Sequence, residues 1–287
     1  MRKVLRWLGY ILAAILVLAL LFAAWMWFAS GRVLGARHEA APERLAMPTA
    51  AQRADGARQL RVLGCANCHG ARLQGQMMFD GGPFAKVWAP NLTLLAPQVG
   101  DQQLAAAIRQ GIGHDGRALF IMPSEVFSRQ SDQEVAALIA AIRAAPRAGG
   151  PVPPIQWGPI GRFALATGGL RPAMAIVADY RAREPLDTGP GEAAGRRLAA
   201  TTCAACHGPD LTGGAGDGPG PAPPDLAIAG AYDPAQFHIL MRTGVPPGGR
   251  DLGLMKEVAT RDFVNYTDEE VGQLYAYLQA RALRAAR

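Results

Sequence analysis

The sequence predicts an all-α protein in which one membrane-spanning helix precedes two tandem copies of a small helical domain. Three features predict this organisation: a long uncharged segment at the N-terminus, two matching cysteine motifs, and a matching amphipathic helix at the end of each half. A length of 287 residues allows about two domains. The composition, 50% hydrophobic and 18% charged, is too apolar for a disordered chain.

The N-terminal segment is long enough to cross a bilayer. Residues 7–31 contain no charged side chain, and a membrane core requires about 20 residues of helix. Three basic residues precede the segment, and Trp25 and Trp27 lie at its far end, where aromatic belts form. We therefore expect an anchor at residues 1–31 that enters from the cytoplasm and contacts lipid through residues 7–29. The alternative is a cleaved signal peptide, although its apolar part is usually about 7–15 residues long.

The net charge of +6 is concentrated at the N-terminus. Residues 1–37 carry five basic and no acidic residues, whereas the other 250 residues carry 24 basic and 23 acidic ones. A nucleic-acid-binding face would require that positive charge on the folded part of the chain. We therefore expect no nucleic-acid partner.

Two C-x-x-C-H motifs use all four cysteines, as CANCH at residues 65–69 and CAACH at residues 203–207. In this signature the thiols bond to the vinyl groups of a c-type haem, and the adjoining histidine ligates the iron. A redox C-x-x-C does not need the histidine. The pairs of a zinc site are normally about 15–20 residues apart, whereas 134 residues separate these pairs. We expect two covalent haem c groups, held by Cys65, Cys68, His69, Cys203, Cys206 and His207.

The motifs belong to an internal repeat. An arginine, a second arginine 8 residues later and a methionine 5 residues after that occur in both halves, as Arg109, Arg117 and Met122 and as Arg242, Arg250 and Met255. Each half then ends in an amphipathic helix whose opening, at residues 131–134 or 267–270, has a capping-box sequence and acids in the first turn. Two copies of one domain explain this pattern.

The repeat predicts domain 1 at residues 51–145 and domain 2 at residues 191–287. A tether at residues 32–50 would keep the haem domains near the membrane but mobile. A linker at residues 146–190 would join the two domains. Its apolar run at residues 163–170 is too short to span a membrane, so we expect it to pack against a domain or to lie at the membrane interface.

Met122 and Met255 are the expected sixth ligands of the two irons. They occupy equivalent positions in the repeat, each on a loop before the final helix. A thioether favours Fe(II) and raises the potential, which suits electron transfer. His114 and His238 are competing ligands, but neither has a histidine counterpart in the other half.

Two prolines are candidates to orient the ligating histidines. Pro90 precedes Asn-Leu and Pro224 precedes Asp-Leu, at comparable places after the two haem motifs. A backbone carbonyl from each proline would hold the imidazole ring of His69 or His207. The alternative is that both prolines are simply rigid loop residues.

Several further segments match between the halves: APNLT, RQGIGHDGR and IMPSEVF in the first, and PPDL, MRTGVPPGGR, LM and YTDEEVGQLYAYL in the second. With the haem motifs, they resemble the class I c-type cytochromes, among them the membrane-anchored dihaem cytochromes of bacterial respiratory chains and the cytochrome subunits of membrane-bound dehydrogenases. The resemblance implies three to four helices around each haem, with His69 and Met122 on one iron and His207 and Met255 on the other. Lys256 follows Met255 where the family commonly has proline.

These features predict an electron carrier and not an enzyme. The sequence shows no catalytic base, nucleophile or substrate-activating metal site, and two fully ligated irons leave no position for a small-molecule substrate. We expect a single-pass protein of the bacterial inner membrane with periplasmic haem domains, and as partner a membrane respiratory complex or dehydrogenase or a soluble cytochrome. The alternatives are a dihaem oxidoreductase, peroxidase-like or thiosulfate-oxidising, and a cytochrome subunit fixed in a larger respiratory or dehydrogenase complex.

Overall fold

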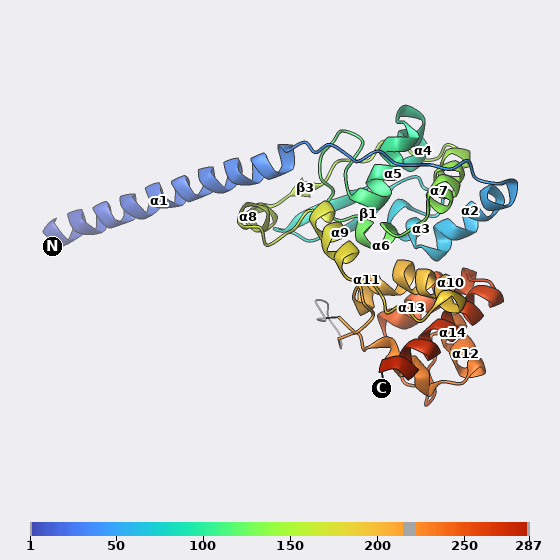
Figure 1. The fold of residues 1–287 in the computed structure, drawn as a ribbon. Helices are drawn as coiled ribbons and strands as arrows, with labels where there is room; N and C mark the ends of the chain where they lie inside the picture. Colours follow the sequence, from blue (N-terminus) through green and yellow to red (C-terminus); the bar gives the residue numbers. More distant parts are fainter. Residues whose placement is uncertain (1, 215–221, 286–287) are drawn as a thin grey trace.

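A computed structural model describes residues 2–214 and 222–285, most of which are helical. A long N-terminal helix, α1 (Arg2–Gly35), projects from a body made of two helical units that lie side by side (Figure 1). The first unit comprises α2 to α7 with a small sheet, and the second unit comprises α10 to α14. The all-α prediction needs one correction, because the first unit contains a three-stranded antiparallel sheet in the order β1-β2-β3.

The first unit is built around its last helix. Val135, Leu138 and Ile139 form a buried stripe on this helix, which packs along the first helix of the unit, where Leu60 is also buried. The helices of the unit are α2 (Ala50–Val62), α3 (Cys65–His69), α4 (Leu92–Leu95), η1 (Ala96–Gln98), α5 (Asp101–Gln110), α6 (Ser124–Phe127) and α7 (Asp132–Ala144).

The sheet follows the first haem motif. Strands β1 (Gln76–Asp80) and β2 (Ala85–Ala89) form a hairpin, and β3 (Gln156–Trp157) extends it from the predicted linker. Gly82 takes a left-handed φ of 55° in the turn between the first two strands. The side chains of β2 alternate between buried and more exposed positions, as in a strand with one face on a core.

The second unit has a similar order of helices. Its last helix is again central, with Val271, Leu274 and Leu278 buried against the first helix and the following segments. The helices are η2 (Pro190–Glu192), α10 (Ala193–Leu198), the π-helical segment η3 (Ala199–Cys203), α11 (Ala204–His207), η4 (Leu226–Ala231), α12 (Pro234–Thr243), α13 (Leu254–Arg261), η5 (Phe263–Asn265) and α14 (Asp268–Ala285).

The capping boxes predicted for the two final helices are confirmed. Ser131 Oγ accepts the backbone N–H of Glu134, whose carboxylate accepts the N–H of Ser131 in return. Thr267 and Glu270 exchange the same pair of hydrogen bonds in the second unit. Because both units fix the N-terminus of the final helix in the same way, the repeat read from the sequence is also a repeat of structure.

The first arginine of each repeat anchors that same helix start. Arg109 donates to the carbonyl of Gln130 at 3.0 Å, and its guanidinium lies 2.8 Å from the Asp132 carboxylate. Arg242 donates to the carbonyl of Tyr266 at 2.8 Å and to Asp268 at 2.6 Å. The two arginines therefore have equivalent partners, one residue before and one residue after the N-cap.

A glycine lets the first and last helices of each unit approach closely. A methyl group on Gly56 would lie 2.7 Å from the carbonyl oxygen of Ala137, and one on Gly195 would collide with the carbonyl oxygen of Gln273. Ala137 and Gln273 both lie six residues after the N-cap of their helix. The helix crossing is therefore the same in both units.

Replacing Gly195 with alanine should separate α10 from α14. We expect Gly195→Ala to lower the free energy of unfolding by about 1–3 kcal/mol, the usual cost of overpacking. Gly272, exposed on α14 with nothing within 4 Å of its missing side chain, is the matched control. Gly272→Ala should raise the free energy of unfolding by about 0.5–1 kcal/mol. Urea unfolding of both variants tests this, and equal effects of the two substitutions would contradict it.

The segment predicted as a mobile tether is docked on the first unit. Helix α1 continues to Gly35, and residues 36–49 then run along the surface near α5. The backbone of Ala41 bonds to the Gln110 amide, and the N–H of Glu43 donates to the Gln102 side chain at 2.8 Å. Glu43 is buried and pairs with Arg109. The first unit is therefore held close to the end of α1, and the expectation of a flexible tether is corrected.

The predicted linker also packs against other elements. Besides β3, it contains α8 (Pro159–Thr167), which contacts α1, and α9 (Ala173–Ala182), which contacts α5 and α6. Gly111, left-handed at the end of α5, lets its backbone meet Ala173. Residues 146–182 thus join the first unit and do not form a free connection.

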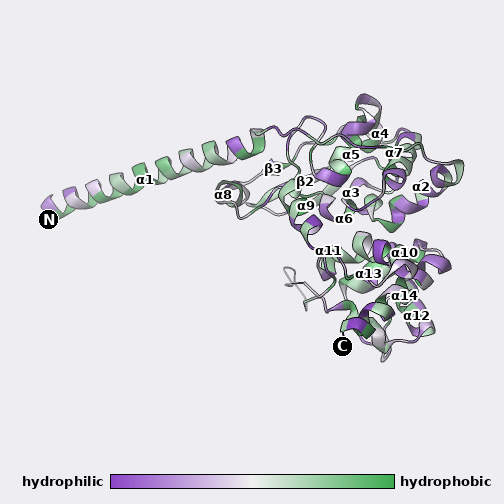
Figure 2. Cartoon of the chain, in the orientation of Figure 1, coloured by the Kyte–Doolittle hydropathy of each residue, from purple (hydrophilic) through white to green (hydrophobic). Residues whose placement is uncertain are grey.

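Helix α1 is apolar enough to cross a membrane by its length and composition. Its side chains from Val4 to Phe28 are exposed except that of Met26, and Figure 2 shows hydrophobic residues along most of the helix. A membrane anchor and a signal sequence both have these properties. The structure therefore places the apolar segment apart from the body of the protein, as a projecting helix.

Candidate functional site

The two C-x-x-C-H motifs form equivalent helical turns. The first is α3, and the second spans the end of η3 and α11; each ends at a glycine with positive φ, 84° at Gly70 and 80° at Gly208. Each turn follows the first helix of its unit. Within the described residues no group of three or more His, Cys, Asp or Glu gathers as a metal site, so the two cysteine pairs do not share one metal.

The chain after each motif folds by the same hydrogen bonds. The N–H of Gly75 donates to the carbonyl of His69 at 2.7 Å, and the N–H of Gly213 donates to that of His207 at 2.9 Å. A leucine lies four residues after each histidine. The carbonyl of Leu73 accepts the N–H of Leu92 at 2.9 Å, and the carbonyl of Leu211 accepts the N–H of Leu226 at 3.0 Å. The same two backbone bonds therefore hold the chain beside each histidine, although strands β1 and β2 lie between them in the first unit.

Those two leucines also share a strained backbone. Leu73 has a φ of 58° and Leu211 a φ of 66°, and in the described part of the chain they are the non-glycine residues with positive φ. This conformation costs a leucine about 1–2 kcal/mol. Both side chains are buried, so packing holds the backbone in place. A strained conformation at the same position of both motifs indicates that both loops meet the same structural requirement.

Each motif histidine is oriented by a proline carbonyl. His69 Nδ1 lies 2.9 Å from the carbonyl oxygen of Pro90, and His207 Nδ1 lies 2.8 Å from that of Pro224. A carbonyl can only accept, so Nδ1 carries the proton and Nε2 keeps its lone pair. Both rings therefore have the tautomer that a metal ligand through Nε2 requires.

Burial favours the neutral form of these imidazoles. It lowers the pKa of His69 and of His207 because the charged ring is poorly solvated, and this outweighs the opposing effect of the proline carbonyl. Burial also raises the pKa of the Cys65 thiol to about 12 and that of Cys203 to about 11. Each motif thus has a neutral nitrogen ligand beside an enclosed thiol, which fits a covalently attached haem.

The two methionines lie in related positions. Met122 and Met255 are half-buried and pack against the apolar core, as do Cys65 and Cys203. Met122 lies two residues before α6, whereas Met255 is the second residue of α13. Helix α6 therefore follows Met122 and Met255 itself lies within a helix, whereas the sequence predicted a loop for both residues.

The competing histidines lie at the surface. His114 is exposed on the loop after α5. His238 is half-buried on α12, and its Nε2 lies 3.0 Å from the carboxylate of Asp268. His114 thus differs from the half-buried methionines in burial, and His238 differs from them in its carboxylate partner.

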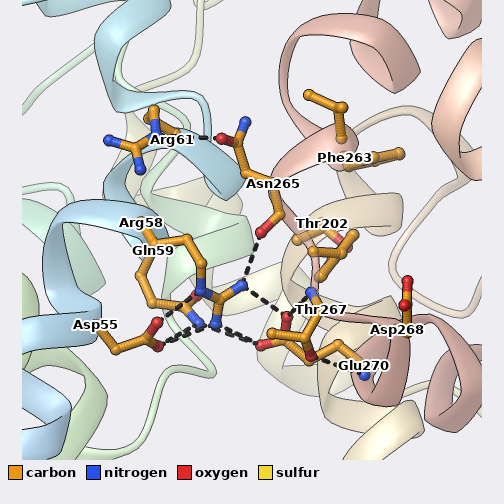
Figure 3. A network of polar contacts seen from close by, with 12 residues as sticks. Asp55, Arg58, Gln59, Arg61, Thr202, Phe263, Asn265, Thr267, Asp268 and Glu270 are labelled. Atoms are coloured by element: carbon orange, nitrogen blue, oxygen red, sulfur yellow. Dashed lines mark hydrogen bonds and ion pairs between the residues drawn. The ribbon is translucent and has the colours of Figure 1, made fainter.

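An ion-paired contact between the units was not foreseen from the sequence. Arg58 on α2 bonds to both carboxylate oxygens of Glu270 at 2.7 and 2.9 Å, and Asp55 holds the other side of the guanidinium (Figure 3). A second ion pair places the arginine in the second unit and the glutamate in the first: Arg197 on α10 bonds to Glu134 at 3.2 Å. The sequence identified both glutamates as capping residues, but nothing in it indicated a second partner more than 200 residues away for Glu270.

The same contact reaches the first haem motif. The side-chain amide of Asn67, within CANCH, donates to both carboxylate oxygens of Asp262 at 3.0 Å. Asp262 is buried between α13 and η5, just beyond Met255 in the chain. The attachment turn of the first unit is therefore fixed against the methionine-bearing segment of the second unit.

Glu270 is ionised in this contact. Burial raises its pKa, but the hydrogen bonds from Arg58 and from the Thr267 N–H outweigh burial and hold the pKa below its usual range. A carboxylate whose pKa falls on folding stabilises the fold above its unfolded pKa, near 4.5, and loses that contribution as the pH drops through the folded value. The ion pair therefore persists at neutral pH.

The paired thiols and the proline-oriented histidine thus recur in both units, and each unit also has a half-buried methionine packed on its apolar core. Residues 192–282 match the family model of cytochrome c, so the second unit is a cytochrome c domain, whose cofactor is covalently bound haem c. This match supports an electron-transfer role for the second unit. No curated protein matched the chain.

Proposed function

We propose that the chain is a membrane-anchored dihaem cytochrome that passes single electrons from a membrane or periplasmic donor to a respiratory acceptor. The family match covers the second unit. The observation that supports a haem in the first unit as well is that both motifs share the His–Pro contact and the strained leucine four residues after the histidine. Haem c supplies one-electron cycling between Fe(III) and Fe(II).

In this proposal each unit supplies four residues to its haem. The cysteines would attach it, and the histidine, through Nε2, and the methionine would ligate its iron. Pro90 and Pro224 are positioning residues, because each carbonyl fixes the ring and tautomer of its histidine. The ligand sets are His69 with Met122 and His207 with Met255.

The proposed location is the bacterial inner membrane, with α1 as a single-pass anchor and the haem units in the periplasm. The apolar length of α1 and the basic residues at its N-terminus support this orientation. Confinement to the membrane surface raises the effective concentration of the cytochrome for a membrane-embedded donor or acceptor.

The visible spectrum of the purified full chain distinguishes a carrier from an enzyme. Two irons with histidine and methionine ligands should both be low-spin, and a redox titration should show two one-electron steps. The control is the same measurement on denatured protein, in which the methionine ligands are released. A high-spin signal in the native chain would show an open iron and favour a dihaem oxidoreductase.

A fixed subunit of a larger complex is the second candidate. The observation that favours it is the docked segment at residues 36–49, which leaves little freedom between α1 and the first unit. Purification in mild detergent distinguishes the two, because a fixed subunit elutes with its partners whereas a free cytochrome elutes alone.

A further inference from the structure

Helix α8 lies beside the C-terminal end of α1 (Figure 1). The ring centroids of Phe163 and Phe22 are 6.1 Å apart. The Arg162 guanidinium lies 3.6 Å from the centroid of Trp27 and donates to Ser30 Oγ at 3.1 Å. Ser30 is fully buried although it belongs to the projecting helix. Packing, stacking and hydrogen bonding therefore fix α8 to α1.

The contacts of α8 place it at the end of the apolar segment. A helix rises 1.5 Å per residue, so about 20 residues cross the hydrocarbon core. Counted from Trp7, the first residue after the basic cluster, that core ends near residue 26. Phe22 then lies just inside the core and Ser30 just outside it. Helix α8, which contacts both, lies at the level where acyl chains meet headgroups.

The outward face of α8 is apolar and uncharged. Ile160 is 54% exposed and Phe163 is 45% exposed, while Gly161 and Leu165 face inward. Arg162 is the one charged residue of the helix, and its guanidinium is directed at α1. In water this face would expose two large apolar side chains beside an equally exposed apolar helix, whereas a bilayer would cover both.

Helix α8 is also attached to the first unit. Gly161 approaches the carbonyl of Phe84 so closely that a side chain there would collide with it, and the N–H of Ile160 donates to the carbonyl of Pro83 at 3.0 Å. The turn between β1 and β2 therefore supports α8 through its backbone. Immersion of α8 would be transmitted directly to the first unit.

We propose that α8 is an interfacial helix whose outward face, centred on Ile160 and Phe163, is immersed in phospholipid and fixes the first unit against the membrane. This inference rests on the proposed role of α1 as a membrane anchor. The ligand is the bilayer and not a protein, because the exposed apolar surface of α1 is continuous with that of α8 and would itself be covered by lipid. If lipid covers the apolar surface of α1, it therefore also covers the adjoining surface of α8.

The test places the photo-crosslinking amino acid p-benzoylphenylalanine at Ile160 or Phe163 of the full chain, reconstituted in nanodiscs of phosphatidylethanolamine and phosphatidylglycerol. Ile239 on α12, 52% exposed, is the matched control remote from α1, and Leu18, 65% exposed on α1, reports on the anchor. After illumination, lipid adducts are counted by mass spectrometry. We expect about tenfold or more adduct at Ile160 and Phe163 relative to Ile239, because burying one such side chain favours immersion by about that factor.

The outcomes separate the two proposals. Adducts at Leu18 but only control levels at Ile160 and Phe163 would overturn the inference and leave the anchor intact. Control levels at all three positions would overturn both. Crosslinks from α8 to a protein in native membranes, without lipid adducts in nanodiscs, would also overturn the inference, because the occupant would then be a protein surface. Two separate positions on α8 guard against misfolding of one variant, which the haem spectrum would reveal.

Discussion

Replacing Cys203 and Cys206 together with alanine is expected to leave a protein with one covalent haem instead of two. The reason is that each unit holds its own attachment turn, histidine and proline carbonyl, and no described cluster joins the two cysteine pairs. The measurement is the mass of the denatured chain, which should fall by one haem, with haem staining on a denaturing gel reduced by about half.

The reciprocal variant, Cys65→Ala with Cys68→Ala, is the control. It should also remove one haem and leave the second unit loaded. If the unsubstituted chain carries a single haem, the first motif is not an attachment site and the dihaem proposal fails. If either double substitution removes both haems, the two units do not load separately.

Met122→Ala is expected to lower the reduction potential of one haem and leave the other nearly unchanged. Loss of the thioether removes the ligand that stabilises Fe(II), and the drop should be on the order of 0.1 V, a fraction of the roughly 0.8 V that axial ligands span. The weak thioether-to-iron charge-transfer band of the oxidised protein should fall by about half. A redox titration and the visible spectrum measure both effects.

Met174→Ala is the matched control, since Met174 is also half-buried but has no counterpart in the other half. It should leave potential and spectrum unchanged. Met255→Ala should reproduce the effect of Met122→Ala at the other haem. If His114→Ala alters the spectrum of the first unit while Met122→Ala does not, His114 is the ligand and our assignment is wrong.

The sequence predicted the parts of this fold that depend on local chemistry. Capping boxes at Ser131 and Thr267 are fixed by residues three apart, and the structure confirms both. The motif turns depend on five consecutive residues and a nearby glycine. The capping boxes and the motif turns are determined by residues close together in the sequence. Their repetition in the two halves was therefore sufficient to locate them.

The sheet and the docked segment were missed for different reasons. The sequence contains a hairpin signal, since Gly81-Gly82-Pro83 separates two short runs that form strands. The prediction of a purely helical repeat did not include it. Residues 36–49 show no periodicity. Their partners are glutamine side chains and backbone groups 59 to 78 positions away, which no local pattern can reveal.

Glu134 and Glu270 each hold the start of their own final helix and an arginine of the other unit. If the N-terminus of α7 or α14 frays, the arginine of the other unit loses its glutamate partner. If the two units separate, both capping glutamates lose their arginine partners. Local opening in one half is thus coupled to the other, so the two halves should unfold together in one cooperative transition. Amide exchange near both N-caps would then report one shared opening energy.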